Sequence, residues 1–184
     1  MKQTFTVQRD AIEEAYRRLS AFNTANGILH TSTDAKGRER MRSRFLGVAV
    51  DLELHRLHHG TFGETYADVN VPDDGGEDLV VNGWTIDVKL TRSDLHARSW
   101  VFSKFQHESR KEGDRGYVFL RAEPVWATAD SLLSQPFDVT VMGALTYEQL
   151  KSRATDLRQR RDEKNVTKRV TARSLNPWKF PNLK

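Results

Sequence analysis

The tightest constraint on the fold is the dipeptide Asn82-Gly83, which joins two strongly apolar runs. Asn-Gly between strand-forming residues favours a two-residue turn in which both residues have a positive φ angle. That turn fixes the register of the two strands, with Val81 facing Trp84 across the ladder. The apolar side chains that this register puts on one face are Leu79, Val81, Trp84, Ile86, Val88 and Leu90. The sequence therefore predicts a β-hairpin with a defined pairing.

The other face of this hairpin carries three charged residues, Asp78, Asp87 and Lys89. The register places the two aspartates directly opposite each other, with Cα atoms about 4.5 Å apart. Like charges in that position repel each other, and a divalent cation held by carboxylate oxygens would compensate. The alternative is a solvent-facing strand, which is the commoner meaning of an isolated Asp-x-Lys pattern.

A third acid is predicted on the helix upstream, at residues 38–59. On a helical wheel Glu53 falls near the middle of the apolar arc, whereas Asp51 falls on the polar side. A buried carboxylate is costly unless it is paired or binds a metal ion. We therefore predict that Glu53 is a third acid directed at the same cation. The alternative is a structural ion pair with one of the many arginines.

A helix with an acid, followed by a hairpin with Asp and Asp-x-Lys, resembles the PD-(D/E)-x-K nuclease superfamily. The matching residues are Glu53, Asp78, Asp87 and Lys89, and the resemblance covers about residues 38–143. It implies an α/β fold in which a central mixed β-sheet is flanked by helices around a restriction-endonuclease-like core. A literal Pro-Asp stands at residues 72–74, but the register favours Asp78, with Asp74 as the fallback.

The resemblance also implies the chemistry. Asp78, Asp87 and Glu53 would hold Mg²⁺, with Mn²⁺ as a substitute, and the cation would polarise the phosphate and lower the pKa of bound water. Lys89 lies two residues after Asp87, on the same face, where it would orient the water or neutralise developing charge. We expect a metal-dependent DNA endonuclease. A junction resolvase, an exonuclease of the same fold and a non-catalytic DNA-binding module remain alternatives.

Apolar patterns predict the remaining elements. Further strands are expected at residues 65–71, 116–121 and 137–143, and helices at 8–22 and 100–111. The stretch Thr146 to Gln149 reads as a capping box that opens a helix carrying Leu150, Ala154 and Leu157 on one side. The histidines at 55, 58 and 59 are expected in the last turn before Gly60, with metal binding as the weaker alternative.

Length and composition favour one domain of 184 residues, with 38% hydrophobic content. We expect residues 1–150 to form the nuclease core, with 151–184 a basic helix and tail of the same domain. The chain has no cysteine and no membrane-spanning apolar run, so an intracellular, cytoplasmic setting is expected (that of a host cell, if a phage encodes the protein).

Charge is unevenly distributed along the chain. Residues 151–184 carry 11 Lys/Arg against 3 Asp/Glu, a net of +8, while the rest carries 18 against 22, a net of −4. A basic segment beside an acidic centre favours phosphate contact, although such runs are usually solvated faces. The predicted partner is double-stranded DNA, and no membrane association is expected. Whether the protein forms a homodimer is left open. The residues predicted to contact DNA are Arg158, Arg160, Arg161, Lys164, Lys168, Arg169 and Arg173.

Overall fold

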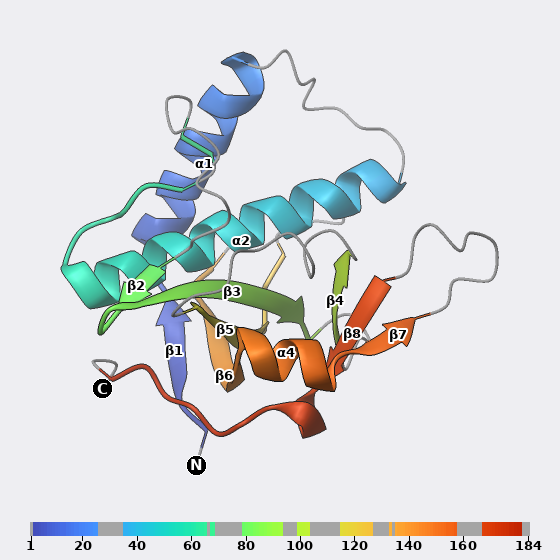
Figure 1. Ribbon diagram of the computed structural model, residues 1–184. Helices are drawn as coiled ribbons and strands as arrows, with labels where there is room; N and C mark the ends of the chain where they lie inside the picture. Colours follow the sequence, from blue (N-terminus) through green and yellow to red (C-terminus); the bar gives the residue numbers. More distant parts are fainter. Residues whose placement is uncertain are drawn as a thin grey trace. The chain divides into compact units, whose positions relative to one another are not determined.

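The computed structural model describes residues 2–25, 35–65, 67–68, 79–93, 99–103, 115–126, 133, 135–157 and 167–181 (Figure 1). The backbone alone is described at residues 25, 35–38, 40, 101–103, 115, 155–157 and 167–168. All statements below concern these residues.

The described chain combines helices with two β-sheets. The helices are α1 (Arg9–Ala25), α2 (Ala35–His59), α4 (Tyr147–Arg153) and the short 3-10 turn η1 (Ala172–Ser174). The strands are β1 (Thr4–Val7), β2 (Leu79–Val81), β3 (Trp84–Arg92), β4 (Ser99–Ser103), β5 (Arg115–Ala122), β6 (Phe137–Thr146), β7 (Thr155–Leu157) and β8 (Thr167–Thr171).

The larger sheet has five strands in the order β1-β6-β5-β3-β2. Strand β2 pairs antiparallel with β3, and β3 pairs parallel with β5, so this sheet is mixed. The smaller sheet has the order β4-β8-β7, with both of its pairings antiparallel. The predicted α/β fold with a mixed sheet is confirmed.

The chain divides into two compact units. The first consists of Met1–Gln3, Glu77–Ala122 and Thr140–Phe180, and the second of Thr4–Gly76, Glu123–Val139 and Pro181–Lys184. Each unit combines segments that are far apart in the sequence. The strand β6 contributes residues to both units.

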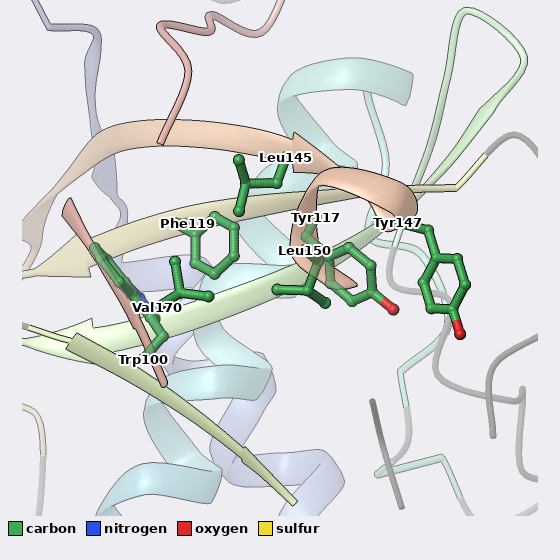
Figure 2. Packing of buried hydrophobic residues seen from close by; sticks show 7 residues of the cluster. All are labelled: Trp100, Tyr117, Phe119, Leu145, Tyr147, Leu150 and Val170. Atoms are coloured by element: carbon green, nitrogen blue, oxygen red, sulfur yellow. The ribbon is translucent and has the colours of Figure 1, made fainter. Parts of the chain in front are cut away.

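The core of the first unit is one cluster of buried side chains (Figure 2). Its members are Trp100, Tyr117, Phe119, Leu145, Tyr147, Leu150 and Val170. They come from the larger sheet, the smaller sheet and α4 together. Trp100 also donates from Nε1 to the carbonyl of Leu120 at 3.2 Å, which satisfies the polar atom of a buried indole. This cluster therefore joins β4 and β8 to β5, β6 and α4.

The second unit is built on α1 and α2, which pack against each other. The rings of Tyr16 and Phe45 lie 3.9 Å apart between centroids, and the Tyr16 hydroxyl accepts from the backbone N–H of Leu133 at 2.9 Å. Helix α2 also packs against β1. The helices predicted at residues 8–22 and 38–59 are confirmed as α1 and α2, and α2 begins three residues before the predicted Arg38.

The end of the described chain is fastened to its beginning within the first unit. The side chain of Gln3 accepts from the backbone N–H of Phe180 at 2.8 Å and donates to its carbonyl at 3.2 Å. Phe180 is buried and stacks edge-on with Trp178. The C-terminal segment is therefore docked onto the body of the unit.

Three secondary-structure predictions are wrong. Residues 99–103 form the strand β4, where a helix was expected over 100–111, and the rest of that range lies outside the described residues. Helix α4 ends at Arg153, because Ala154 is extended (φ −71°, ψ 131°) and 155–157 form β7. The described residues between 65 and 68 form a turn where a strand was expected, closed by Asp68 N–H to Thr65 O at 2.9 Å. The capping box at Thr146 and Gln149 is confirmed.

Candidate functional site

The hairpin β2–β3 has the predicted turn and register. Asn82 has φ 51° and Gly83 has φ 81°, the two positive values that this turn requires. The Cα partners are Leu79 with Ile86, Val80 with Thr85 and Val81 with Trp84. Asp78, which the same register would place opposite Asp87, lies outside the described residues, and so does the fallback Asp74.

The predicted apolar face of the hairpin is buried only in part. Ile86 is buried, but Trp84 is 42% exposed. The pairing of β3 with β5 begins at Thr85 with Arg115, so Trp84 extends beyond the ladder beside the turn. The neighbouring residue on β5 is Gly116, which offers no side chain to cover the indole. Trp84 is therefore only partly covered at the end of the predicted apolar face.

Asp87 and Lys89 lie on the same face of β3, as their spacing predicts. Lys89 Nζ is 2.5 Å from Asp87 Oδ1, while the side chains are 22% and 6% exposed. Burial of Asp87 excludes the simple alternative of a solvated strand face. The arrangement holds one buried carboxylate next to one partly accessible ammonium group.

The neighbour of Asp87 on β5 is a tyrosine that the sequence analysis did not single out. The parallel register pairs Asp87 with Tyr117, and Lys89 with Phe119. Paired positions on adjacent strands share a face, so Asp87 and Lys89 lie on the face of the sheet that carries the core cluster. The signal that would have identified Tyr117 is a strand pairing between segments about thirty residues apart, which local sequence patterns do not reveal.

Glu53 is fully buried on α2, as its position on the apolar arc predicts. Its Oε1 accepts from Arg56 Nη2 at 2.5 Å, one helical turn away. Its Oε2 accepts from the backbone N–H of Gln8 at 3.2 Å, directly before the first turn of α1. The hydrogen bond to Glu53 raises the pKa of Arg56 above its usual range. These are the contacts of a structural ion pair; a metal-binding role for Glu53 stays a prediction.

No group of three or more His, Asp or Glu side chains in the described part of the chain is arranged to hold a metal ion. Among the described side chains of the first unit, Asp87 is the buried carboxylate, and a hard oxygen donor of this kind suits Mg²⁺ or Mn²⁺. A site of two carboxylates would need Asp78 as well.

The three histidines lie in the last turns of α2, as predicted. The rings of His55 and His59 are 5.7 Å apart between centroids, and α2 ends before Gly60 (φ 79°), whose N–H donates to the carbonyl of Arg56 at 2.8 Å. Burial, and then electrostatic interaction with His59 and His55, lower the pKa of His58.

The residues predicted to contact DNA fall into two groups. Arg158, Arg160, Arg161 and Lys164 lie outside the described residues, and Lys168 is described by its backbone in β8. Arg169 of β8 and Arg173 of η1 are exposed. The sequence predicts a helix and tail for these residues, whereas the described ones lie on a strand and a 3-10 turn.

Comparison with models of protein families, with curated proteins and with solved structures finds no match to this chain. Among the described residues, no helix has the length and apolar character needed to cross a membrane.

Proposed function

We propose that the protein is a metal-dependent DNA endonuclease of restriction-endonuclease-like fold, and that the hairpin β2–β3 carries its active site. The observation that carries this proposal is the pairing of buried Asp87 with Lys89 on β3. These residues follow a hairpin turn whose register, continued by one pair beyond Leu79 and Ile86, would bring Asp78 opposite Asp87.

The order of elements supports the proposal. The resemblance rested on a helix with an acid, a hairpin, and two further strands, and these correspond to α2, β2–β3, β5 and β6. The burial of Asp87 adds a physical argument, because a strand that only faced solvent would leave this carboxylate exposed.

The residues of the hairpin fit a hard divalent cation. Asp87 and Asp78 would hold Mg²⁺, which is bound through one or two carboxylates and keeps several waters. The bound ion supplies a polarised phosphate oxygen and a water of lowered pKa. Lys89 is within reach of the same carboxylate, where its ammonium group would stabilise negative charge on the phosphate.

Supercoiled plasmid tests this function directly. The wild-type protein is incubated with plasmid in Mg²⁺ and, separately, in chelator, beside Asp87→Asn as the site variant. We expect nicked or linear product with Mg²⁺ alone, and none from Asp87→Asn. Absence of cleavage by the wild-type protein across Mg²⁺ and Mn²⁺ would contradict the proposal.

A non-catalytic DNA-binding module is the second candidate. The short Asp87–Lys89 contact favours it, because a carboxylate and an ammonium group that neutralise each other need no metal ion. That protein would bind plasmid without cutting it, and Asp87→Asn would change its stability but leave its affinity for DNA intact. The form of the cut ends separates an endonuclease from an exonuclease, because an exonuclease leaves a closed circle intact.

A further inference from the structure

The turn of the hairpin β2–β3 is open to water. Asn82 and Gly83 are both exposed, and a Cβ atom added at Gly83 would have no heavy atom within 4 Å beyond its chain neighbours. Asn82 has a positive φ of 51°, a conformation that residues with a side chain adopt uncommonly. The turn is therefore accessible to water while its backbone is held in a constrained conformation.

An asparagine that precedes a glycine can modify itself. The backbone nitrogen of the glycine attacks the side-chain carbonyl carbon of the asparagine, and the missing glycine side chain leaves the approach unhindered. A carbon–nitrogen bond forms, the bond to the amide nitrogen breaks, and ammonia leaves with the proton of the backbone N–H. Water then opens the cyclic imide. Opening at one carbonyl gives aspartate, and opening at the other gives isoaspartate, in which the main chain runs through the former side chain.

The attacking nitrogen in this chain belongs to Gly83, which lies outside both ladders of the hairpin. In a two-residue turn the flanking residues form the first pair, and here these are Val81 and Trp84. The pairing of β3 with β5 begins at Thr85. The nitrogen of Gly83 is thus next to the side chain of Asn82 without being part of the described strand pairing.

The two other described asparagines lack these features. Asn23 lies within α1, where the backbone N–H of the next residue belongs to the helix. Asn176 precedes Pro177, whose nitrogen carries no proton. Asn26 also precedes a glycine, but it lies outside the described residues. Among the described residues, the chemistry therefore selects Asn82.

We propose that Asn82 is a site of intramolecular deamidation, and that isoaspartate at this position releases β2 from β3. Isoaspartate lengthens the main chain within a turn whose two-residue length sets the register. Strand β2 has three pairs with β3 and lies at the edge of the described sheet, whereas β3 has eight pairs with β5. The edge strand is therefore the part that detaches, and Asp87 and Lys89 stay on β3. The register that would bring Asp78 opposite Asp87 is lost. This inference concerns the hairpin and does not depend on the proposed function.

Ageing of the folded protein, followed by peptide mass spectrometry, tests the chemistry. The protein is kept in mildly alkaline buffer beside a sample unfolded in urea, and both are mapped for conversion of amide to acid and for isoaspartate. We expect folded Asn82 to convert at no less than about one tenth of its rate in urea, because reorienting one turn peptide costs at most about one hydrogen bond. Asn23 and Asn176 should remain amides in the folded protein.

Hydrogen exchange of the aged protein tests the release of β2. The isoaspartate form, separated by ion exchange, should lose amide protection at Leu79–Val81 and keep it in β5. Two variants are matched controls, because Asp-Gly and Gly-Gly favour the same turn as Asn-Gly. Freshly prepared Asn82→Asp has the added charge on an ordinary main chain, and Asn82→Gly has no amide to lose. Both should keep β2 protected, Asn82→Gly also after ageing.

Three outcomes would overturn the proposal. A folded rate at Asn82 below about one tenth of the rate in urea would show that the turn protects the amide. Equal conversion at Asn23 in the folded protein would show that the turn does not select the site. Unchanged protection of β2 in the isoaspartate form, or equal loss of protection in fresh Asn82→Asp, would show that the lengthened main chain does not release the strand.

Discussion

The two compact units use their charged side chains in opposite ways. In the second unit, carboxylates are bonded to arginines of the same unit: Arg18 donates to Glu14 at 2.8 Å and to Asp68 at 2.7 Å, and Arg56 donates to Glu53. In the first unit, the described exposed charges are basic with the exception of Glu148, and the buried acid Asp87 contacts Lys89.

This difference indicates a division of roles. Paired charges within the second unit fix the N-terminus of α1 and the turn after α2 in place, as Arg18 also donates to the carbonyl of Gly63 at 2.6 Å. We infer that the paired charges serve the fold in the second unit, and we propose that Asp87 and Lys89 of the first unit serve a ligand.

The largest expected effect tests whether the units are separate at all. Leu150→Ala in the first unit and Leu52→Ala in the second each delete a fully buried side chain, and each should cost about 2–5 kcal/mol of unfolding free energy. Hydrogen exchange should lose protection mainly in β5 and α4 for the former, and mainly in α1 and α2 for the latter. Uniform loss in both variants would show that one cooperative core spans the chain.

A smaller effect is expected from Glu53→Gln, measured by thermal or denaturant unfolding in chelator. If Glu53 is the structural partner of Arg56, the variant should lose about 1.5–3 kcal/mol, the contribution of hydrogen bonds to a charged group. Asp51→Asn, on the less buried side of the same helix, is the matched control. Stability that holds or rises in Glu53→Gln would instead support the predicted metal role, because removal of a metal ligand relieves repulsion when no metal is bound.

The smallest effect is a pH dependence confined to the second unit. Hydrogen bonds from Arg17 and Arg18 lower the pKa of Glu14 from 4.5 to about 2. The lowered pKa stabilises the folded state above pH 4.5, and this contribution is lost as the pH falls from 4.5 towards 2. We expect about 1 kcal/mol, because Arg17 is exposed and such pairs contribute little. Glu14→Gln should flatten the acid limb of stability against pH, and Glu13→Gln should leave it unchanged.

The sequence predicted those features that short-range chemistry determines. Asn82-Gly83 determines the hairpin register by its turn, Thr146 and Gln149 form the capping box, and the apolar arc of α2 places Glu53 in the interior. Each of these features depends on residues that are close together in the sequence.

The features it missed depend on distant partners. Strand β8 pairs with β4, more than sixty residues earlier, so the basic stretch around Arg169 reads as a helix or tail until that partner is known. The pattern Ser99-Trp-Val-Phe-Ser103 favours a strand by its β-branched and aromatic residues, and the helix predicted over 100–111 from apolar spacing gave these propensities too little weight. Tyr117 becomes a neighbour of Asp87 only through the parallel pairing of β3 with β5.

The central claim is that Asp87 binds a metal ion in addition to its contact with Lys89. Titration calorimetry with Mn²⁺ tests this claim most directly. The wild-type protein should bind Mn²⁺, and Asp87→Asn should weaken binding by at least about tenfold, since loss of even outer-shell partners costs that much. Lys89→Gln should bind Mn²⁺ as tightly as the wild type or more tightly, because the ammonium group no longer neutralises the carboxylate. Equal Mn²⁺ affinity in the wild type and a folded Asp87→Asn variant would contradict the account and leave Asp87 as the structural counter-ion of Lys89.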